Sequence, residues 1–353
     1  MVRAMGSRVF LLCMGILVGC LGGEVMVRVL LSPAPPDVVP REIGQFDHQL
    51  GWSLKPSAQA ISTRTGQPIE YRINSKGLRD DETSYEKPDG TFRIVVLGDS
   101  RTFGFGVPIE KHFTKLLEGY FRSVEVVNLG VSGYGVDQEL LLLRTEGFRY
   151  QPDLVVAYVA HYGDSRHMYD ERWGKPKPRF VLRDGHLKLT NVPVPQPAAP
   201  SILSWSGLRY RLYEHSRAYR LIREALLGVG RTDETLSSDQ GSDKREAEES
   251  FTAELNRLGE TIIQAMHEES RANGAEFVLV TQIGRLQQFA VQRGIASLDV
   301  SVALTNSALA VSKELMHINE AGNGVLAWEL AQFLRTRQIV PSQHLPPVER
   351  ATS

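Results

Sequence analysis

The sequence predicts an α/β protein in which helices cover both faces of a parallel sheet. Short apolar runs rich in Val, which are typical of buried parallel strands, alternate with segments of helical periodicity. The 353 residues include 42% hydrophobic and 23% charged side chains, the composition of an ordinary globular protein. Alternation of strands and helices along a globular chain indicates a parallel sheet covered on both faces.

Each strand and helix is predicted from a local pattern. Strands are predicted for the apolar runs at 92–97, 124–129, 154–159, 277–281 and 295–300. Helices are predicted at 108–122, 137–148, 251–273 and 320–336. In the first helix, Pro108 suits the first turn, and the residues on one face are apolar, namely Phe113, Leu116, Leu117, Tyr120 and Phe121.

The other parts of the chain are interpreted as flanking or inserted segments. Residues 32–40 contain four prolines and form a stiff spacer, and the polar stretch 42–89 is an N-terminal extension. The segment 165–201 is predicted as a loop, 208–227 as a short helix and the charged segment 231–250 as either disordered or a mobile loop. The predicted organisation is therefore an N-terminal apolar segment at 1–31, a spacer and extension at 32–90, a main domain at 91–336 with an insertion at about 165–250, and a loose tail at 337–353.

The N-terminal segment predicts that the body of the chain lies outside the cytoplasm. Arg3 and Arg8 precede an apolar run from Val9 to Val27, the pattern of a signal for export or anchoring. At roughly 19 residues, the run is long enough to span a bilayer as an uncleaved helix. Leu17-Val18-Gly19-Cys20 also matches a lipobox, with Cys20 as the lipidated residue, and ordinary cleavage is a third alternative.

Charge and cysteine content exclude several classes of function. A formal net charge of -1 provides no basic surface, so we expect no nucleic-acid partner. Both cysteines, Cys13 and Cys20, lie in the apolar N-terminal segment, which leaves the globular part without a disulfide or a cysteine metal site. The His residues show no ligand spacing. We therefore expect neither a metal ion nor a cofactor.

A candidate nucleophile follows the predicted strand 92–97, in Gly98-Asp99-Ser100. Strand ends in open α/β sheets collect catalytic side chains, and a Ser on the departing turn can lie near helix N–H groups. Ser100 is therefore the candidate nucleophile, and Asp99 is expected to hold the turn through side-chain-to-backbone bonds. The alternative is a turn without catalytic function. The stretch from Gly98 to Gly106 resembles block I of the SGNH (GDSL-type) hydrolases.

A second segment that resembles this family contains the candidate base, His317. The segment 314–322, Glu-Leu-Met-His-Ile-Asn-Glu-Ala-Gly, resembles block V, in which an Asp three residues before the His completes the triad. His317, Asn319 and Gly322 match the block, whereas Glu314 occupies the Asp position. The resemblance implies that Glu314 orients the imidazole, and Asp299 is the alternative acid. Taken alone, His317 would be interpreted as an exposed loop His.

Two further segments resemble the blocks that form the oxyanion hole. Asn128-Leu129-Gly130-Val131-Ser132-Gly133-Tyr134-Gly135 resembles block II and implies a backbone N–H donor at Gly133, with Gly130 and Asn128 as possible support. A turn rich in Gly for close packing alone is the alternative. His161-Tyr162-Gly163-Asp164 aligns with block III, but Gly163 replaces the donor Asn, a loss on the order of 3 kcal/mol. His161, Tyr162 and Ser165 are candidate substitutes, and Asp164 matches.

The resemblance covers approximately 50–79, 93–164 and 314–334. The layout of the chain looks like that of membrane-anchored bacterial SGNH-like proteins associated with exopolysaccharide and the cell envelope. It implies a flavodoxin-like three-layer α/β/α fold and a Ser-His-acid mechanism without metal. The expected substrates are esters of a glycan or lipid, with O-acetyl groups favoured. The expected activity is that of an esterase or O-acyltransferase using Ser100, His317 and Glu314. The alternative is an inactive member that binds glycan or scaffolds polysaccharide assembly, which Gly163 and Glu314 favour.

Overall fold

The computed structural model describes residues 14–15, 18–19, 21–26, 40–63, 65–160, 166–172, 175–196, 216, 218–219, 241–311 and 317–346. The chain divides into two compact units, one formed by 1–36 and 197–248 and the other by 37–196 and 249–353. The second unit contains the central sheet and every described candidate site residue. Its architecture therefore determines how those residues are positioned.

The central sheet has five strands, all parallel: β5 (Phe92–Gly98), β6 (Val124–Asn128), β7 (Leu154–Val159), β12 (Glu276–Thr281) and β13 (Ala296–Asp299). Their order across the sheet is β13-β12-β7-β5-β6. The first strand of the sheet thus lies between the second and the third, which is the flavodoxin-like order. All five predicted strands and the predicted parallel sheet are confirmed.

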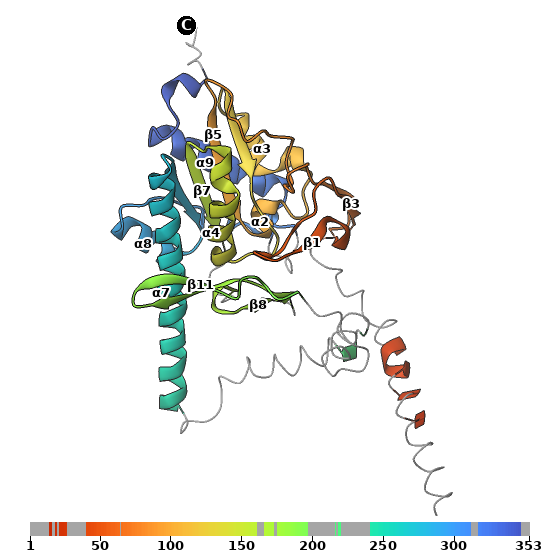
Figure 1. Ribbon diagram of the computed structural model, residues 1–353. Helices are drawn as coiled ribbons and strands as arrows, with labels where there is room; N and C mark the ends of the chain where they lie inside the picture. The colour runs from red at the N-terminus through yellow and green to blue at the C-terminus, as the bar shows by residue number, and fades with distance from the viewer. Residues whose placement is uncertain are drawn as a thin grey trace, which may run out of the picture. The chain divides into compact units, whose positions relative to one another are not determined.

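Helices cover both faces of this sheet (Figure 1). On β5, Val95 and Leu97 belong to one buried cluster, and Ile94 and Val96 to the other, because alternate side chains of a strand point to opposite faces. The first cluster includes residues of α4 (Val136–Thr145), α7 (Gly241–Ala272) and α8 (Gly284–Gln292). The second includes residues of α3 (Phe113–Glu118) and α9 (Glu320–Thr336). The protein is therefore a three-layer α/β/α structure.

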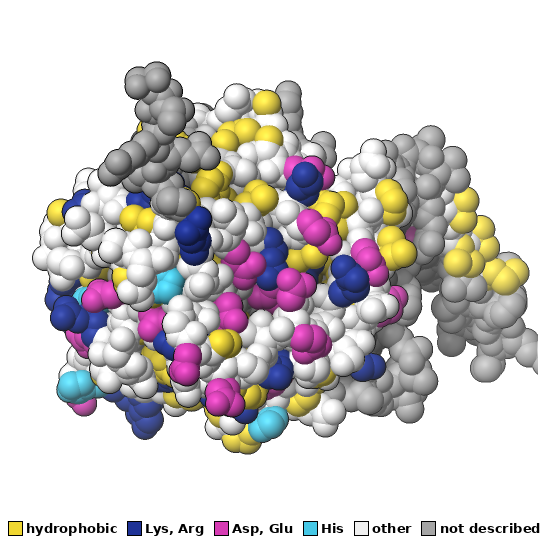
Figure 2. Space-filling view, turned by 90° about the horizontal axis from the view of Figure 1, so that it is seen from above, with side chains coloured by type: hydrophobic (Ala, Val, Ile, Leu, Met, Phe, Trp, Pro, Cys, Tyr) yellow, Lys and Arg dark blue, Asp and Glu magenta, His cyan; other side chains and the backbone are white. Residues whose placement is uncertain are grey.

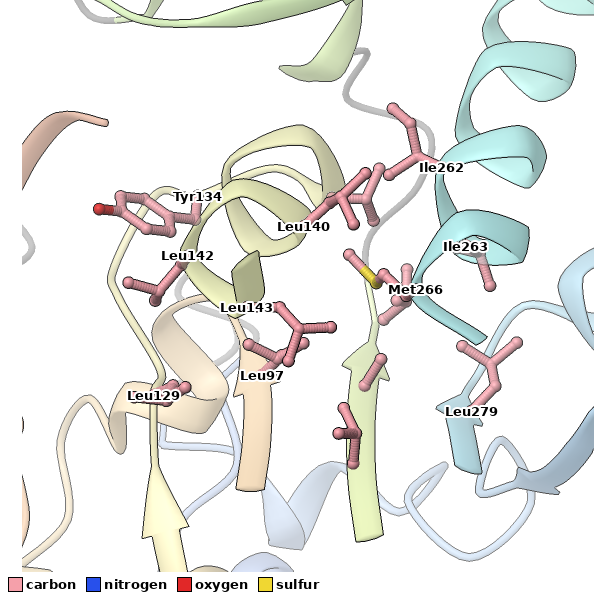
Figure 3. Close-up of a cluster of buried hydrophobic side chains, with 14 of the residues drawn as sticks. Leu97, Leu129, Tyr134, Leu140, Leu142, Leu143, Ile262, Ile263, Met266 and Leu279 are labelled. Carbon is pink, nitrogen blue, oxygen red and sulfur yellow. The ribbon is translucent and has the colours of Figure 1, made fainter. Parts of the chain in front are cut away.

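The first cluster packs α4 and α7 against the sheet (Figure 3). Leu140 and Leu143 of α4 and Ile262 and Met266 of α7 are fully buried, and they share this cluster with Leu97 of β5. Burying an apolar side chain of this size contributes about 1.5–3 kcal/mol, so the layer contributes substantially to stability. The helix α9, predicted at 320–336, has those bounds in the structure.

Several helical segments differ from the predictions. The helix predicted at 137–148 is α4, which ends at Thr145 and is followed by a 3-10 turn at Gly147–Tyr150. The segment 108–122 divides into a 3-10 turn at Ile109–Lys111 and α3, because His112 between them has an extended backbone. Helix α7 begins at Gly241, within the charged segment predicted as disordered or a mobile loop. The helix predicted at 251–273 is confirmed as part of α7. Helix α8 was missed because its weak local pattern becomes helical where one face packs against β12 and β13.

The segment 165–201, predicted as a loop, contains two hairpins. These are β8 (Glu171–Arg172) with β9 (Lys175–Pro176), and β10 (Arg179–Arg183) with β11 (His186–Thr190). Phe180, in β10, and Lys177, between the two hairpins, are buried. The prediction was wrong because prolines and lysines usually indicate exposed loops, whereas here Lys177 has a buried partner, Asp137.

The N-terminal extension also consists of hairpins, β1 (Gly44–Asp47) with β2 (Gly51–Leu54), and β3 (Gln59–Ser62) with β4 (Ile69–Arg72). Ile69 and Tyr71 of β4 pack with Phe103 and Phe105, which follow the candidate nucleophile. At the other end, the tail is not loose through its first residues. His344 is buried and its Nδ1 lies 2.9 Å from the Arg122 carbonyl oxygen.

Within the described residues, no helix is both long and apolar enough to cross a membrane. Most of the predicted anchor at 1–31, including Cys13 and Cys20, lies outside the described residues, as does most of the helix predicted at 208–227. Figure 2 shows acidic and basic side chains interspersed on one face of the molecule.

Candidate functional site

Ser100 lies where β5 ends, between β6 on one side and β7 on the other. This is the point at which the strand order reverses, and open α/β sheets bind ligands there. Ser100 begins a one-turn helix, α2 (Ser100–Phe103), and Asp99 is its N-cap. Ser100 is buried, with 8% of the residue exposed. The fold therefore places the predicted nucleophile at a topological switch point.

The structure brings His317 to Ser100 although 217 residues separate them in the sequence. The distance between His317 Nε2 and Ser100 Oγ is 2.7 Å, a hydrogen bond. The ring of Phe105 packs against the imidazole, with the ring centroids 4.8 Å apart. An unprotonated Nε2 at this distance can accept the hydroxyl proton, which is the geometry required of a general base for a Ser nucleophile.

The loop that contains His317 is held by its neighbours. Val311 N donates to the His317 carbonyl oxygen at 2.6 Å, and Ala310 pairs with Ile318 in an antiparallel bridge. The side chain of Asn319 caps α9 by accepting from Gly322 N at 3.0 Å, and its Nδ2 donates to the Ala308 carbonyl oxygen at 2.7 Å. The Asn of the His-x-Asn-x-x-Gly segment therefore connects the His317 loop to α9.

The predicted role of Asp99 is confirmed, and a partner was missed. Asp99 Oδ1 accepts from Arg101 N at 3.0 Å, which fixes the turn that leads into α2. Asp99 Oδ2 lies 2.8 Å from Arg166 Nη1, and both side chains are largely buried. No sequence signal identified Arg166, because it follows a segment without regular pattern and its contact with Asp99 is long-range.

The loop after α2 is fixed by Arg79, which is 1% exposed. Arg79 donates to the carbonyl oxygens of Phe103 at 3.0 Å, Val107 at 2.7 Å and also Gly104. Its guanidinium lies 4.3 Å from the ring centroid of Tyr71. Burial lowers the pKa of Arg79 to about 10, which still leaves it charged at neutral pH. The sequence segment that contains Arg79 was noted, but this structural role was not.

His112 supports α2 from the α3 side and is fully buried. Its Nε2 lies 3.0 Å from the Arg101 carbonyl oxygen and its Nδ1 lies 2.8 Å from Thr114 Oγ1. Since a carbonyl oxygen only accepts, Nε2 carries the proton and Nδ1 accepts from the hydroxyl, so the neutral ring satisfies both bonds. Burial lowers the pKa of His112 from 6.5 to about 3.

We expect His112 to make the protein less stable in mild acid. The unfolded chain binds a proton at His112 near pH 6.5 and the folded chain does so only near pH 3, so the contribution is complete above 6.5 and is lost as the pH falls towards 3. Between pH 7.5 and pH 5 this amounts to about 2 kcal/mol. Urea unfolding at both pH values, with the wild type and His112→Gln compared, isolates the effect.

The comparison with His112→Gln is necessary because Asp80 acts in the opposite direction. Asp80 is buried, with Lys115 Nζ at 3.0 Å, and burial raises the pKa of Asp80 to about 6. Its stabilising contribution is present below its ordinary pKa of 3.8 and is lost as the pH rises through 6. Both proteins retain Asp80, so its contribution to the pH dependence of the free energy of unfolding cancels when wild type and variant are compared. An equal loss in wild type and variant would contradict the role of His112.

The Gly-rich segment after β6 lies against α2. A Cβ at Gly130 would approach Phe103 N and the Thr102 carbonyl carbon to 2.3 Å, so this close contact requires glycine. Asn128 Oδ1 accepts from Gly130 N at 2.9 Å. Gly133 has φ of +86° at the third position of the turn closed by Tyr134 N and the Val131 carbonyl oxygen, 3.2 Å apart. The packing role is thus observed for Gly130, while the oxyanion role of Gly133 stays a prediction.

Several predicted site residues lie outside the described residues. These are Glu314, His161, Gly163 and Asp164, with Tyr162 and Ser165 beside them. The alternative acid, Asp299, is exposed at the end of the edge strand β13, and its Oδ1 accepts from Ser301 N at 2.8 Å. Asp299 therefore caps a turn at the edge of the sheet.

Within the part of the chain that the structure describes, no group of three His, Cys, Asp or Glu residues is arranged to hold a metal ion. An open groove of about 360 Å³ lies beside the His317 loop. It is lined by the β3–β4 hairpin, the loop after α2 and the start of α9, through Thr65, Gln67, Ile69, Gly106, Ala310, Val311, Asn319, Glu320 and Ala321. Ser100 and His317 are not part of its lining.

Comparison with known proteins gave similarities to solved structures alone: no family model and no curated protein matched the chain. TesA is 15% identical, with 70% of this chain and 99% of TesA covered at a TM-score of 0.39. The psychrotrophic esterase EstA from Pseudoalteromonas sp. is 12% identical, with 70% of this chain and 98% of EstA covered at a TM-score of 0.38. Axe2, an acetylxylan esterase from Geobacillus stearothermophilus, is 15% identical, with 71% of this chain and 95% of Axe2 covered at a TM-score of 0.36. At these TM-scores the similarities assign neither family nor activity, which depend on the chain's own residues.

Proposed function

We propose that this chain is a Ser-dependent esterase or O-acyltransferase of the SGNH (GDSL-type) class. The observation that supports it is the 2.7 Å hydrogen bond between His317 Nε2 and Ser100 Oγ at the switch point of the sheet. A Ser hydroxyl is a weak nucleophile unless a base accepts its proton, and a neighbouring imidazole is the usual base. A partly buried Ser–His hydrogen bond, with the Ser at the end of β5, therefore favours acyl transfer.

The proposed reaction has two steps. Ser100 Oγ attacks the acyl carbonyl carbon while His317 Nε2 takes the hydroxyl proton. The tetrahedral intermediate then expels the alcohol, to which His317 returns the proton, and leaves an acyl group on Ser100. Water or an acceptor alcohol attacks this ester in the same way, which releases the acyl group and restores Ser100. Hydrolysis and transfer differ only in the acceptor.

We also propose roles for the oxyanion hole and the orienting acid, a substrate class and a location. The backbone N–H groups of Ser100 and Gly133 bind the oxyanion, and Glu314 orients the imidazole of His317. We propose O-acetyl esters of a glycan or lipid as substrates, without metal or cofactor. We also propose that the N-terminal segment anchors the protein in a membrane, either as a helix or through lipidated Cys20, with the sheet domain outside the cytoplasm. The basic and apolar N-terminal sequence supports this location.

Labelling of the nucleophile tests the proposed function. The full-length chain, purified in detergent, is incubated with a fluorophosphonate, which reacts with activated Ser residues, and the modified peptide is found by mass spectrometry. We expect labelling at Ser100 and time-dependent hydrolysis of p-nitrophenyl acetate that the label abolishes. Because His317 activates Ser100, His317→Gln should prevent both the labelling and the hydrolysis. Labelling elsewhere, or hydrolysis that persists after Ser100 is labelled, would contradict the proposal.

A binding function is the second candidate, because Gly163 occupies the position of the oxyanion-hole Asn in the resemblance. A protein with this function would bind an acetylated oligosaccharide without releasing acetate. Acetate release and binding measured on the same oligosaccharide separate the two candidates: binding with no Ser100-dependent release favours the second.

A further inference from the structure

We propose that Arg166 is a positioning residue that holds the Ser100 turn and the Gly133 turn in register through one guanidinium group. This inference rests on the function proposed above, since both turns carry residues assigned to acyl transfer. Arg166 was not a candidate from the sequence. Its role follows from two hydrogen bonds that converge on one nitrogen atom.

One nitrogen of Arg166 binds both turns. Nη1 donates to Asp99 Oδ2 at 2.8 Å and to the Tyr134 carbonyl oxygen at 2.9 Å. Asp99 directly precedes Ser100, and its other oxygen accepts from Arg101 N, so the carboxylate is part of the nucleophile turn. Tyr134 directly follows Gly133. A shift of either turn would therefore break a charge-assisted hydrogen bond, which is stronger than one between neutral groups.

The backbone of Arg166 is fixed by its neighbours. Arg166 begins the 3-10 turn Arg166–Met168, in which both following residues are buried. His167 Nε2 lies 2.9 Å from the Leu255 carbonyl oxygen in α7. Met168 belongs to the hydrophobic cluster that covers the sheet. A Cβ at Gly135 would lie 3.0 Å from Arg166 Cβ, so this residue is packed directly against the Gly-rich turn. The guanidinium thus projects from a fixed support.

Within the described residues, Asp99 forms an ion pair with Arg166. The Asp99 and Arg166 side chains are 7% and 11% exposed, so this ion pair is largely removed from water. Glu139 is also buried nearby, and burial raises its pKa well above the ordinary value, which favours the neutral form. Removal of Arg166 would therefore take away the cation that lies 2.8 Å from the buried Asp99 carboxylate, next to the nucleophile.

A guanidinium is needed because two acceptors on different turns must be reached with fixed geometry. Arg presents a planar, rigid group of donors, whereas a Lys ammonium is a compact charge on a flexible stem. Positioning of this kind affects the chemical step more than binding, because a displacement of about 1 Å of a catalytic group can cost about a hundredfold in rate. Arg166 does not itself touch the reacting atoms.

The kinetic test compares Arg166→Ala, Arg166→Lys and wild type, with Arg144→Ala as the control. Arg144 also pairs with a carboxylate, Glu269, at 2.5 Å, but on the surface. With p-nitrophenyl acetate we expect Arg166→Ala to lower kcat about a hundredfold with little change in KM. Added guanidinium, at concentrations far below those that unfold the chain, should restore part of kcat in Arg166→Ala, and none in Arg144→Ala. The kcat of Arg166→Lys should remain below that of Arg166→Ala in the presence of guanidinium.

A second measurement tests the clamp without relying on catalysis. Hydrogen exchange followed by mass spectrometry should show faster exchange in two separate segments of Arg166→Ala, 99–105 and 131–136. Arg144→Ala should leave both segments as in wild type. If wild type lacks hydrolysis that depends on Ser100, the proposed function fails while the exchange result still decides the role of Arg166. Unchanged exchange in both segments, or a kcat like that of Arg144→Ala in an active enzyme, overturns the inference.

Discussion

Replacement of Ser100 by Ala is expected to abolish ester hydrolysis, with kcat lowered by about four orders of magnitude or more. The variant removes the hydroxyl oxygen that lies 2.7 Å from His317 Nε2, and with it the acyl-enzyme intermediate. The substitution deletes one atom at a position that is 8% exposed, so the fold should be retained. The measurement is the initial rate with p-nitrophenyl acetate, together with the thermal unfolding midpoint.

A second Ser provides the control for this variant. Ser301 follows the edge strand β13, and its backbone N–H donates to Asp299 at 2.8 Å, so its hydroxyl is not needed for that bond. Ser301→Ala should hydrolyse the substrate as wild type does. If Ser100→Ala retained the wild-type rate while remaining folded, the hydrolysis would come from another group, and Ser100 would not be the nucleophile.

The largest effect on stability is expected from Lys177, whose side chain is fully buried against the buried carboxylate of Asp137. Lys177 Nζ also donates to the carbonyl oxygens of Tyr169 at 3.0 Å and Pro178 at 2.9 Å. Lys177→Met would leave Asp137 buried without a cation. Breaking a buried pair from one side costs about 3–5 kcal/mol, and urea unfolding at neutral pH should show a loss of this size.

Two further variants separate the lost pair from lost packing. Lys177→Met combined with Asp137→Leu removes both buried charges, and we expect it to recover most of the lost free energy of unfolding. Lys87→Met breaks a more exposed pair, in which Lys87 Nζ lies 2.7 Å from Asp153 Oδ1, and should cost about 1 kcal/mol or less. A loss at Lys177 no greater than that at Lys87 would show that the buried pair does not support the hairpins.

The parallel strands could be predicted because their signals are local. Each is a short apolar run, and the run 154–159 has the same bounds in the structure as in the prediction. Strand β13, at the edge, was predicted two residues too long. Helix α8 was missed because its apolar face is short and is recognisable only against β12 and β13. The hairpins at 171–190 were missed because their stabilising contacts come from distant residues.

The sequence by itself determined the α/β class, the strand positions and the pair Ser100 and His317, because these depend on local periodicity and on short motifs. Only the tertiary structure decided that Arg79, Arg166 and Lys177 are buried and which groups they bind. A charged side chain is usually exposed, so its sequence position predicts solvent contact. Burial becomes favourable only when the fold supplies a partner, and each of these residues has one that is distant in the sequence: Phe103 lies 24 positions from Arg79, Asp99 lies 67 from Arg166 and Asp137 lies 40 from Lys177.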